Sequence, residues 1–128
     1  MGNFRKLQVW QRARDLAVYI YRVTEQGCFS KDFGLKVQIR RAAVSVPSNI
    51  AEGDELDTNK QAIKFLYIAK GSSAEILTQS IIAREIGYLN DDTYCHIEQE
   101  VTAVSKMLTR LIQARLNSPK PQTLKPKT

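Results

Sequence analysis

Residues 38–53 read Gln38-Ile39-Arg40-Arg41-Ala42-Ala43-Val44-Ser45-Val46-Pro47-Ser48-Asn49-Ile50-Ala51-Glu52-Gly53. Their main apolar positions recur every three or four residues, which is the spacing of one face of an α-helix. The pattern predicts a helix from about residue 31 to residue 52, with Ser30 as its N-cap and Gly53 as its end. Pro47 lies inside this helix and predicts a kink. A break at Pro47 is the alternative, because proline biases the preceding residue toward extended geometry.

Three further helices are predicted on either side of this segment, at about residues 6–26, 57 or 58–86 and 91–116. Each shows apolar residues at helical spacing, and no strand-like alternation extends beyond a few residues. Gly27 and Gly87 are expected to end the first and third helices, and Asn90 or Asp91 to cap the last. The run Gly71-Ser72-Ser73 inside the third helix weakens it, so we expect a neighbouring helix to approach closely there.

Four amphipathic helices with short connections predict an all-α fold, an antiparallel up-and-down four-helix bundle over residues 1–117. Residues 118–128 contain three prolines and three lysines. Such a composition cannot build a core, so this segment is predicted to be a flexible basic tail.

The two central helices carry more apolar surface than one bundle core can bury, which predicts a homo-oligomer. A second stripe on residues 31–52 repeats every seven residues, nearly opposite the main face. An irregular bundle that buries both stripes within one chain is the alternative. The residues expected at the oligomer interface are Val37, Val44, Ala51, Phe65, Ile68 and Leu77.

Size and composition favour a single small domain, since the chain has 128 residues, of which 43% are hydrophobic and 25% charged. Two cysteines are too few for a disulfide scaffold, so a reducing cytoplasm is the expected location. The longest uncharged run, residues 42–51, is too short to span a membrane. We therefore expect a cytoplasmic protein that has no membrane partner.

The net charge of +6 is unevenly distributed. Residues 1–41 contribute +6 and the tail +3, whereas residues 42–57 contribute −4. This asymmetry is typical of a protein that contacts an acidic partner such as RNA or DNA. The candidate nucleic-acid-binding residues are Arg12, Arg14, Arg22, Lys36, Arg40, Arg41, Lys120, Lys125 and Lys127.

Two alternatives apply to these assignments. Arg40 and Arg41 could instead pair with carboxylates such as Glu52 at an oligomer interface, because the arginine fork suits such contacts. Phe4, Tyr19 and Tyr21 could stack on bases, although packing in the core is the more common role of such residues.

No arrangement for enzymatic chemistry is evident. His96 and its neighbour Cys95 point about 100° apart on a helix and do not form a natural chelate. The cluster Glu52, Asp54, Glu55 and Asp57 suggests a magnesium or acid–base site, but a solvated acidic turn explains it better. No nucleophile–histidine–carboxylate set or phosphate-binding glycine loop is present. We expect no enzymatic activity, no metal and no cofactor.

Several motifs carry a resemblance to a known family. They are Phe4-Arg5-Lys6-Leu7-Gln8-Val9-Trp10-Gln11, Phe33-Gly34-Leu35, the segment 38–53 quoted above, Phe65-Leu66-Tyr67-Ile68-Ala69-Lys70-Gly71-Ser72 and Gly87-Tyr88-Leu89. Over residues 4 to about 116 the chain resembles the bacterial four-helix bundle proteins, also called the 23S rRNA intervening-sequence protein family. The resemblance implies an up-and-down bundle, a ring-like pentamer and no known enzymatic activity. It also implies similarity to the accessory variability determinant of diversity-generating retroelements, which binds nucleic acid and a reverse transcriptase.

The chain departs from the pattern of that family at two places. Asp54, Glu55 and Asp57 stand where the family commonly has basic and serine residues, which makes that end of the bundle a poor phosphate site. Leu77 replaces a charged residue, which favours self-association. The sequence thus predicts an oligomeric bundle that binds structured RNA or DNA. The alternative is a protein-interaction scaffold whose arginines hold the oligomer and which recruits a protein partner.

Overall fold

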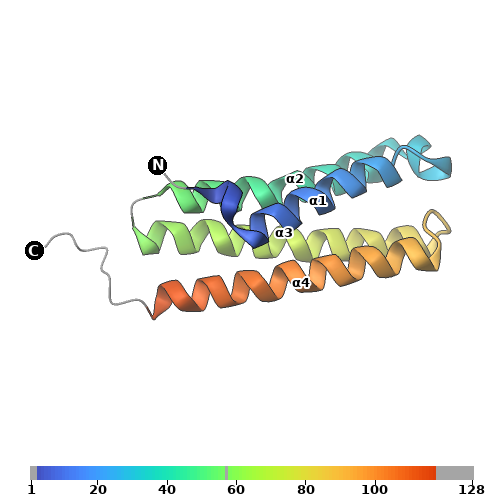
Figure 1. The fold of residues 1–128 in the computed structure, drawn as a ribbon. Coiled ribbons are helices and arrows are strands. Elements are labelled where there is room, and N and C mark those ends of the chain that lie inside the picture. Colours follow the sequence, from blue (N-terminus) through green and yellow to red (C-terminus); the bar gives the residue numbers. More distant parts are fainter. Residues whose placement is uncertain (1–2, 57, 118–128) are drawn as a thin grey trace, which may run out of the picture.

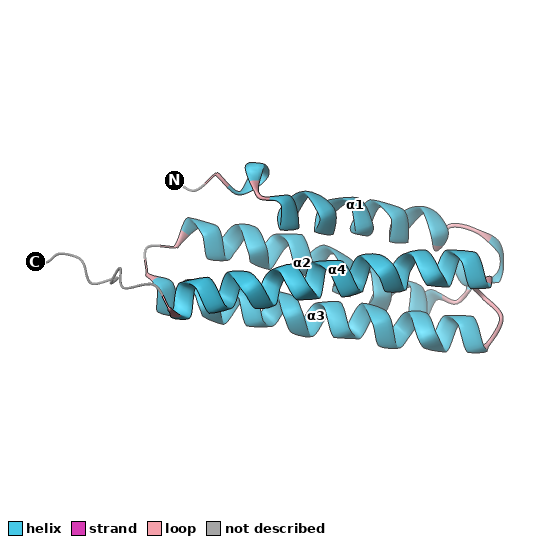
Figure 2. Cartoon of the chain, turned by 60° about the horizontal axis from the view of Figure 1, so that its bottom comes forward, coloured by secondary structure: helices cyan, strands magenta, loops and turns pink. Residues whose placement is uncertain are grey.

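The computed structural model describes residues 3–56 and 58–117. Its elements in chain order are the short 3-10 helix η1 (Phe4–Lys6), α1 (Gln8–Val23), the 3-10 helix η2 (Gly27–Lys31), α2 (Phe33–Glu55), α3 (Asn59–Glu85) and α4 (Asp91–Leu116). The four α-helices run side by side and alternate in direction, as Figure 1 shows. No strand occurs in the described residues, and Figure 2 shows helices joined by loops. The predicted all-α, antiparallel up-and-down bundle is confirmed.

Each α-helix packs against two neighbours, so that α1 contacts α2 and α4, while α3 contacts α2 and α4. The residues that meet in the centre are the apolar positions of the predicted main stripes. They include the fully buried Ile20, Ile39, Ile76, Ile97 and Leu108. Burying these side chains supplies the main favourable free energy of the fold, because apolar surface leaves water. Among the described helices, none has the length and hydropathy that crossing a bilayer requires.

The connection between α1 and α2 differs from the prediction. The helix α1 ends at Val23 rather than near residue 26, and the buried Thr24 donates its hydroxyl to the Ile20 carbonyl at 2.8 Å. The prediction that Ser30 caps α2 is wrong. Ser30 lies in η2, and Asp32 caps α2 by accepting a hydrogen bond from the Leu35 amide at 3.1 Å. A carboxylate one residue before the helix satisfies its free amides and complements its positive end.

Asp32 has a second partner beyond the helix that it caps. The Tyr88 hydroxyl, from the loop between α3 and α4, donates to the other carboxylate oxygen at 2.9 Å. That hydrogen bond raises the pKa of Tyr88, because the nearby carboxylate disfavours the phenolate. Asp32 therefore ties the start of α2 to the α3–α4 connection at one end of the bundle.

The end of α2 also differs from the prediction, because Gly53 does not terminate the helix. The helix continues to Glu55, and Gly53 is buried within it. A Cβ at this position would lie 3.1 Å from the Ala62 carbonyl oxygen of α3. Gly53 therefore allows the backbones of α2 and α3 to approach closely. The break at Pro47 is excluded, since α2 is continuous through that residue.

The run of small residues in α3 has the expected packing role at two of its three positions. Ser72 and Ser73 are buried, and the Ser72 and Ser45 hydroxyl oxygens are 2.8 Å apart across the α2–α3 contact. Gly71 is exposed, and a Cβ built on it would meet nothing within 4 Å. The prediction of close helix approach is thus confirmed at Ser72 and Ser73 and wrong at Gly71.

The start of α4 agrees with the prediction, whereas α3 begins at Asn59, just after the predicted start at residue 57 or 58. Thr58 caps α3 by accepting from the Gln61 amide at 3.2 Å, and Asn90 caps α4 by accepting from the Thr93 amide at 2.8 Å. Each side-chain oxygen satisfies an amide that has no carbonyl partner within its own helix.

Candidate nucleic-acid interface

A groove runs along the outside of the bundle between α1 and α2, with a volume of about 340 Å³. Arg14 and Arg22 come from α1, and Val44 and Pro47 come from α2. The remaining lining residues, Ala17, Val18 and Tyr21, also come from α1. The groove thus has an apolar floor and two guanidinium groups, and we name it the α1–α2 groove.

The two arginines of the α1–α2 groove differ in their contacts. Arg14 pairs with its neighbour Asp15 at 3.0 Å, and its guanidinium lies 5.2 Å from the ring centre of Trp10. Its side chain is still about half exposed. Arg22 is exposed and makes no ion pair within residues 3–56 and 58–117. An exposed arginine pair can exchange its weak partners for phosphate oxygens at little cost.

Tyr21 lies in the same groove with 42% of its surface exposed. The Arg40 guanidinium packs against the face of this ring, 4.3 Å from the ring centre. Arg40 also donates to the Thr24 hydroxyl at 2.8 Å, to the Tyr21 carbonyl at 3.0 Å and to the Glu25 carboxylate at 3.0 Å. These contacts place Arg40 where the C-terminal end of α1 meets α2, a contact that we name the joint.

The joint also contains Lys36, whose ammonium nitrogen lies 3.5 Å from the Glu25 carboxylate. The hydrogen bond from Arg40, together with the charges of Lys36 and Arg40, lowers the pKa of Glu25. Lys36 and Arg40 therefore hold this end of α1 within the chain. Sequence reasoning could not find this role, because Glu25 and Thr24 are separated from Arg40 by the whole connection between the helices.

The remaining predicted basic residues do not join the α1–α2 groove. Arg12 pairs with Glu100 of α4 at 3.1 Å, and that hydrogen bond raises the pKa of the guanidinium. Arg41 is exposed on the α2–α3 side, in a shallow groove with Gln38 and Glu75. Lys120, Lys125 and Lys127 lie outside the described residues. Of the nine candidates, the structure thus brings together Arg14 and Arg22 in one groove. Arg40 packs against the ring of Tyr21 in the same groove.

The predicted interface residues are likewise spread over different faces. Val44 lies in the α1–α2 groove, while Leu77 lies in a groove between α3 and α4 on the other side of the bundle. Ile68 is 43% exposed on α3, and Val37, Ala51 and Phe65 are half-buried. Large exposed apolar side chains that were not predicted at the oligomer interface are Val18, Tyr21, Phe33, Tyr67, Ile81, Ile82, Ile86 and Leu116.

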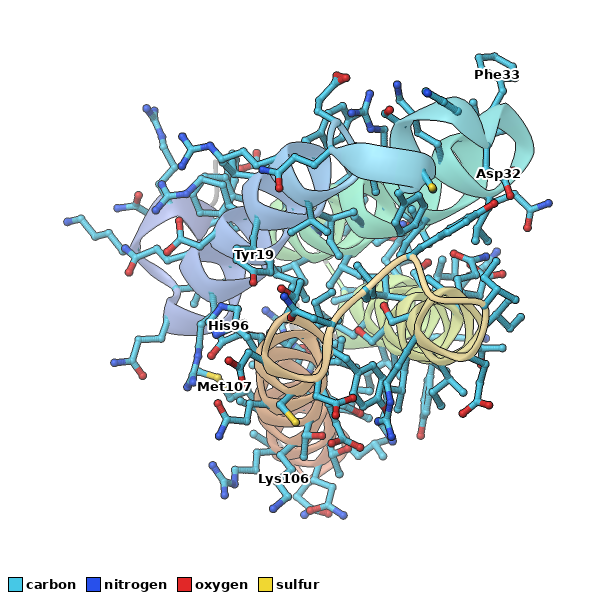
Figure 3. The ribbon with its side chains drawn as sticks, turned by 90° about the vertical axis from the view of Figure 1, so that its right-hand side faces the viewer. Tyr19, Asp32, Phe33, His96, Lys106 and Met107 are labelled. Carbon is cyan, nitrogen blue, oxygen red and sulfur yellow. The ribbon has the colours of Figure 1, made fainter. Side chains whose placement is uncertain are left out.

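A pocket of about 500 Å³ between α1 and α4 brings together charged side chains. The Tyr19 and His96 rings lie 4.5 Å apart there, centre to centre, and Figure 3 shows the two side chains meeting between the helices. Asp15, Arg22 and Glu100 complete the polar lining. Sequence reasoning missed this cluster, because contact between α1 and α4 depends on the closure of the bundle.

Groups suited to metal binding or nucleophilic chemistry do not converge in the described part of the chain. No set of three or more His, Cys, Asp or Glu residues there is placed to hold a metal ion. Cys28 and Cys95 are both exposed free thiols. Asp54 of the acidic segment lies 3.9 Å from Arg115 of α4, and Asp57 falls outside the described residues.

Comparison with known proteins identifies a solved structure with a similar fold and a matching protein family. No curated protein matches the chain. A crystal structure of a protein with unknown function from the S23 ribosomal protein family of Bacteroides thetaiotaomicron superposes with a TM-score of 0.76 at 24% sequence identity. The match covers 82% of this chain and 98% of that one. Residues 5–110 match the model of the 23S rRNA-intervening sequence proteins, and the chain belongs to that family.

Proposed function

We propose that this protein is a non-enzymatic helical bundle that binds nucleic acid along the α1–α2 groove. One observation carries the proposal: Arg14 and Arg22 line the same groove that exposes the ring of Tyr21. Arginines bind phosphates and tyrosine stacks on bases, so this set supplies both contacts that a nucleic acid requires. The name of the family, which refers to an intervening sequence of 23S rRNA, is consistent with an RNA ligand.

The spacing of the groove suits structured RNA with unpaired bases. Arg14 and Arg22 are eight residues apart on α1, which corresponds to about 12 Å along the helix axis. Two phosphates could contact the arginines while a base next to Arg22 stacks on Tyr21. Stacking on a side chain requires a base that has left its own helix, so loops and bulges should bind better than uniform duplex.

The test is a titration of fluorescent hairpin RNA and duplex DNA with the full chain, at salt concentrations from about 50 to 200 mM. The double variant Arg14→Glu/Arg22→Glu should weaken binding by at least about tenfold and reduce its salt dependence. The matched control is Lys64→Glu/Arg110→Glu, which makes the same change in net charge at exposed positions of α3 and α4.

Tyr21→Leu separates stacking from charge. It should lower affinity for hairpin RNA by roughly tenfold and leave duplex DNA unaffected, since base stacking contributes about 1–3 kcal/mol per base. Equal losses in the groove variant and in the control variant would contradict the proposed site. Absence of binding at the lowest salt would contradict the proposed function.

We also propose that the protein is a homo-oligomer, as its exposed apolar surface suggests. Ile68 and Ile82 of α3, and Ile86 directly after its end, are each between 43% and 53% exposed. Large apolar side chains of this kind are candidates for burial at an interface. The family resemblance implies five subunits. Light scattering at micromolar concentration should give a mass several times 14.5 kDa. The variant Ile68→Glu/Ile82→Glu should reduce that mass, whereas a wild-type monomer would contradict this proposal.

The same exposed surface supports the second candidate function, a scaffold that recruits another protein. A well-defined oligomer that ignores RNA and DNA at low salt, yet retains a specific protein, would favour the scaffold over the nucleic-acid binder.

A further inference from the structure

A second groove lies between α3 and α4, with a volume of about 550 Å³. Because α1 contacts α2 and α3 contacts α4, this α3–α4 groove is on the opposite side of the bundle from the α1–α2 groove. Its walls include Tyr67, Lys70 and Leu77 of α3, and Thr102, Ser105 and Lys106 of α4. The groove is larger than the α1–α2 groove, and the two grooves share no lining residue.

The floor of the α3–α4 groove is apolar and its rims are basic. Val101 is buried at the base, Leu77 is half-buried, and the Tyr67 ring is 53% exposed. Lys70 stands on the α3 wall and Lys106 on the α4 wall, and Figure 3 shows Lys106 pointing away from the bundle. Among the described residues, no carboxylate lines the groove. The charged side chains that line the groove, Lys70 and Lys106, are therefore both positive.

Gly71 gives an independent reason to expect an occupant. Glycine weakens the interior of a helix, so a glycine there requires a packing explanation. Gly71 lines the α3–α4 groove, and apart from its own stretch of helix no atom of the described chain lies within 4 Å of the position where its Cβ would be. Packing within the described chain therefore does not require a glycine at this position. A second backbone lying in the groove would require one, because a side chain at residue 71 would occupy its space.

We propose that the α3–α4 groove binds an acidic amphipathic helix from another protein. The apolar face of that helix covers Leu77 and Val101, and its carboxylates pair with Lys70 and Lys106. The wall from Tyr67 to Leu77 spans ten residues, about 15 Å, which accommodates roughly three turns of a partner helix. The apolar floor favours a helix over a nucleic-acid strand, whose backbone would require more cations along its path.

The test uses the full chain and two labelled synthetic helices of about 16 residues. One peptide carries leucine on one face and glutamate elsewhere, and the other carries lysine in place of every glutamate. Fluorescence anisotropy should show binding of the glutamate peptide and much weaker binding of the lysine peptide. Amide chemical shifts should move at Gly71, Thr102 and Ser105.

Two variants locate the site. Lys70→Glu/Lys106→Glu should weaken binding of the glutamate peptide by roughly tenfold and strengthen binding of the lysine peptide. Gly71→Leu should weaken binding of the glutamate peptide by a similar factor, because the new side chain would fill the α3–α4 groove without clashing with the rest of the chain. Gly34→Leu is the matched control, since Gly34 is another exposed helical glycine outside the groove, and it should bind like wild type.

Three results would overturn the proposal. The first is that neither peptide binds, or that the glutamate peptide binds equally to the wild type and both groove variants. The second is a lower oligomer mass for Gly71→Leu, which would assign the groove to a second copy of this chain. The third is loss of hairpin RNA binding in Lys70→Glu/Lys106→Glu without any peptide binding, which would assign it to nucleic acid. None of these results depends on whether Arg14→Glu/Arg22→Glu weakens nucleic-acid binding.

Discussion

Arg40 is the single side chain that joins α1 to α2 most directly. It bonds the Thr24 hydroxyl, the Tyr21 carbonyl and the Glu25 carboxylate, and only 17% of its side chain is exposed. We expect Arg40→Ala to lower the free energy of unfolding by about 2 kcal/mol, because a buried hydroxyl and a carbonyl lose their donor. Urea denaturation measures the change. Arg41→Ala is the control and should stay within about 0.5 kcal/mol of wild type. Equal effects would contradict the assigned role.

Glu25 makes the same joint sensitive to acid. Its pKa is lowered in the folded chain by the hydrogen bond from Arg40 and by the charges of Lys36 and Arg40. A lowered pKa adds stability that is present above the unfolded pKa, about 4.3 for glutamate, and lost as pH falls through the folded pKa. We expect Glu25→Gln to lose less stability than wild type between about pH 6 and pH 3. Thermal melts across that range test this, with Glu85→Gln as an exposed control.

At the scale of the elements, Gly53 and Gly71 occupy opposite situations in two neighbouring helices. A Cβ at Gly53 would lie 3.1 Å from a backbone oxygen of α3, whereas one at Gly71 would meet nothing. We expect Gly53→Ala to destabilise the bundle, because α2 and α3 would have to separate. Gly71→Ala should stabilise it by about 0.5–1 kcal/mol, the difference in helix propensity. Unfolding midpoints of the two variants should move in opposite directions, and a shared direction would show that α2 and α3 pack differently.

At the scale of the whole molecule, part of the positive charge lies in the residues that follow Asn117. Residues 118–128 carry Lys120, Lys125 and Lys127 and no carboxylate, so half of the net charge of +6 belongs to them. We expect deletion of these residues to reduce the slope of log affinity against log salt by up to about three units for RNA. An unchanged slope would show that the lysines beyond residue 117 do not contact phosphates.

The helices were predictable because their cause is local. Apolar residues at three- and four-residue spacing require a helix, and four such segments with short connections require a bundle. Asn90 was also predictable as a cap, since a cap binds amides within its own first turn. The errors at Ser30 and Gly53 arose where a nearer cap or a neighbouring helix outweighed the local signal.

By itself, the amino-acid sequence determined the number, approximate position and buried face of the helices, together with the excess of positive charge. Only the tertiary structure decided which of the basic residues share a surface. Arg40 and Arg41 are adjacent in sequence but project about 100° apart on α2. One therefore binds the end of α1, and the other faces α3. Arg14, Arg22 and Tyr21 form a groove because α2 lies beside α1, and that arrangement depends on how all four helices close around one core.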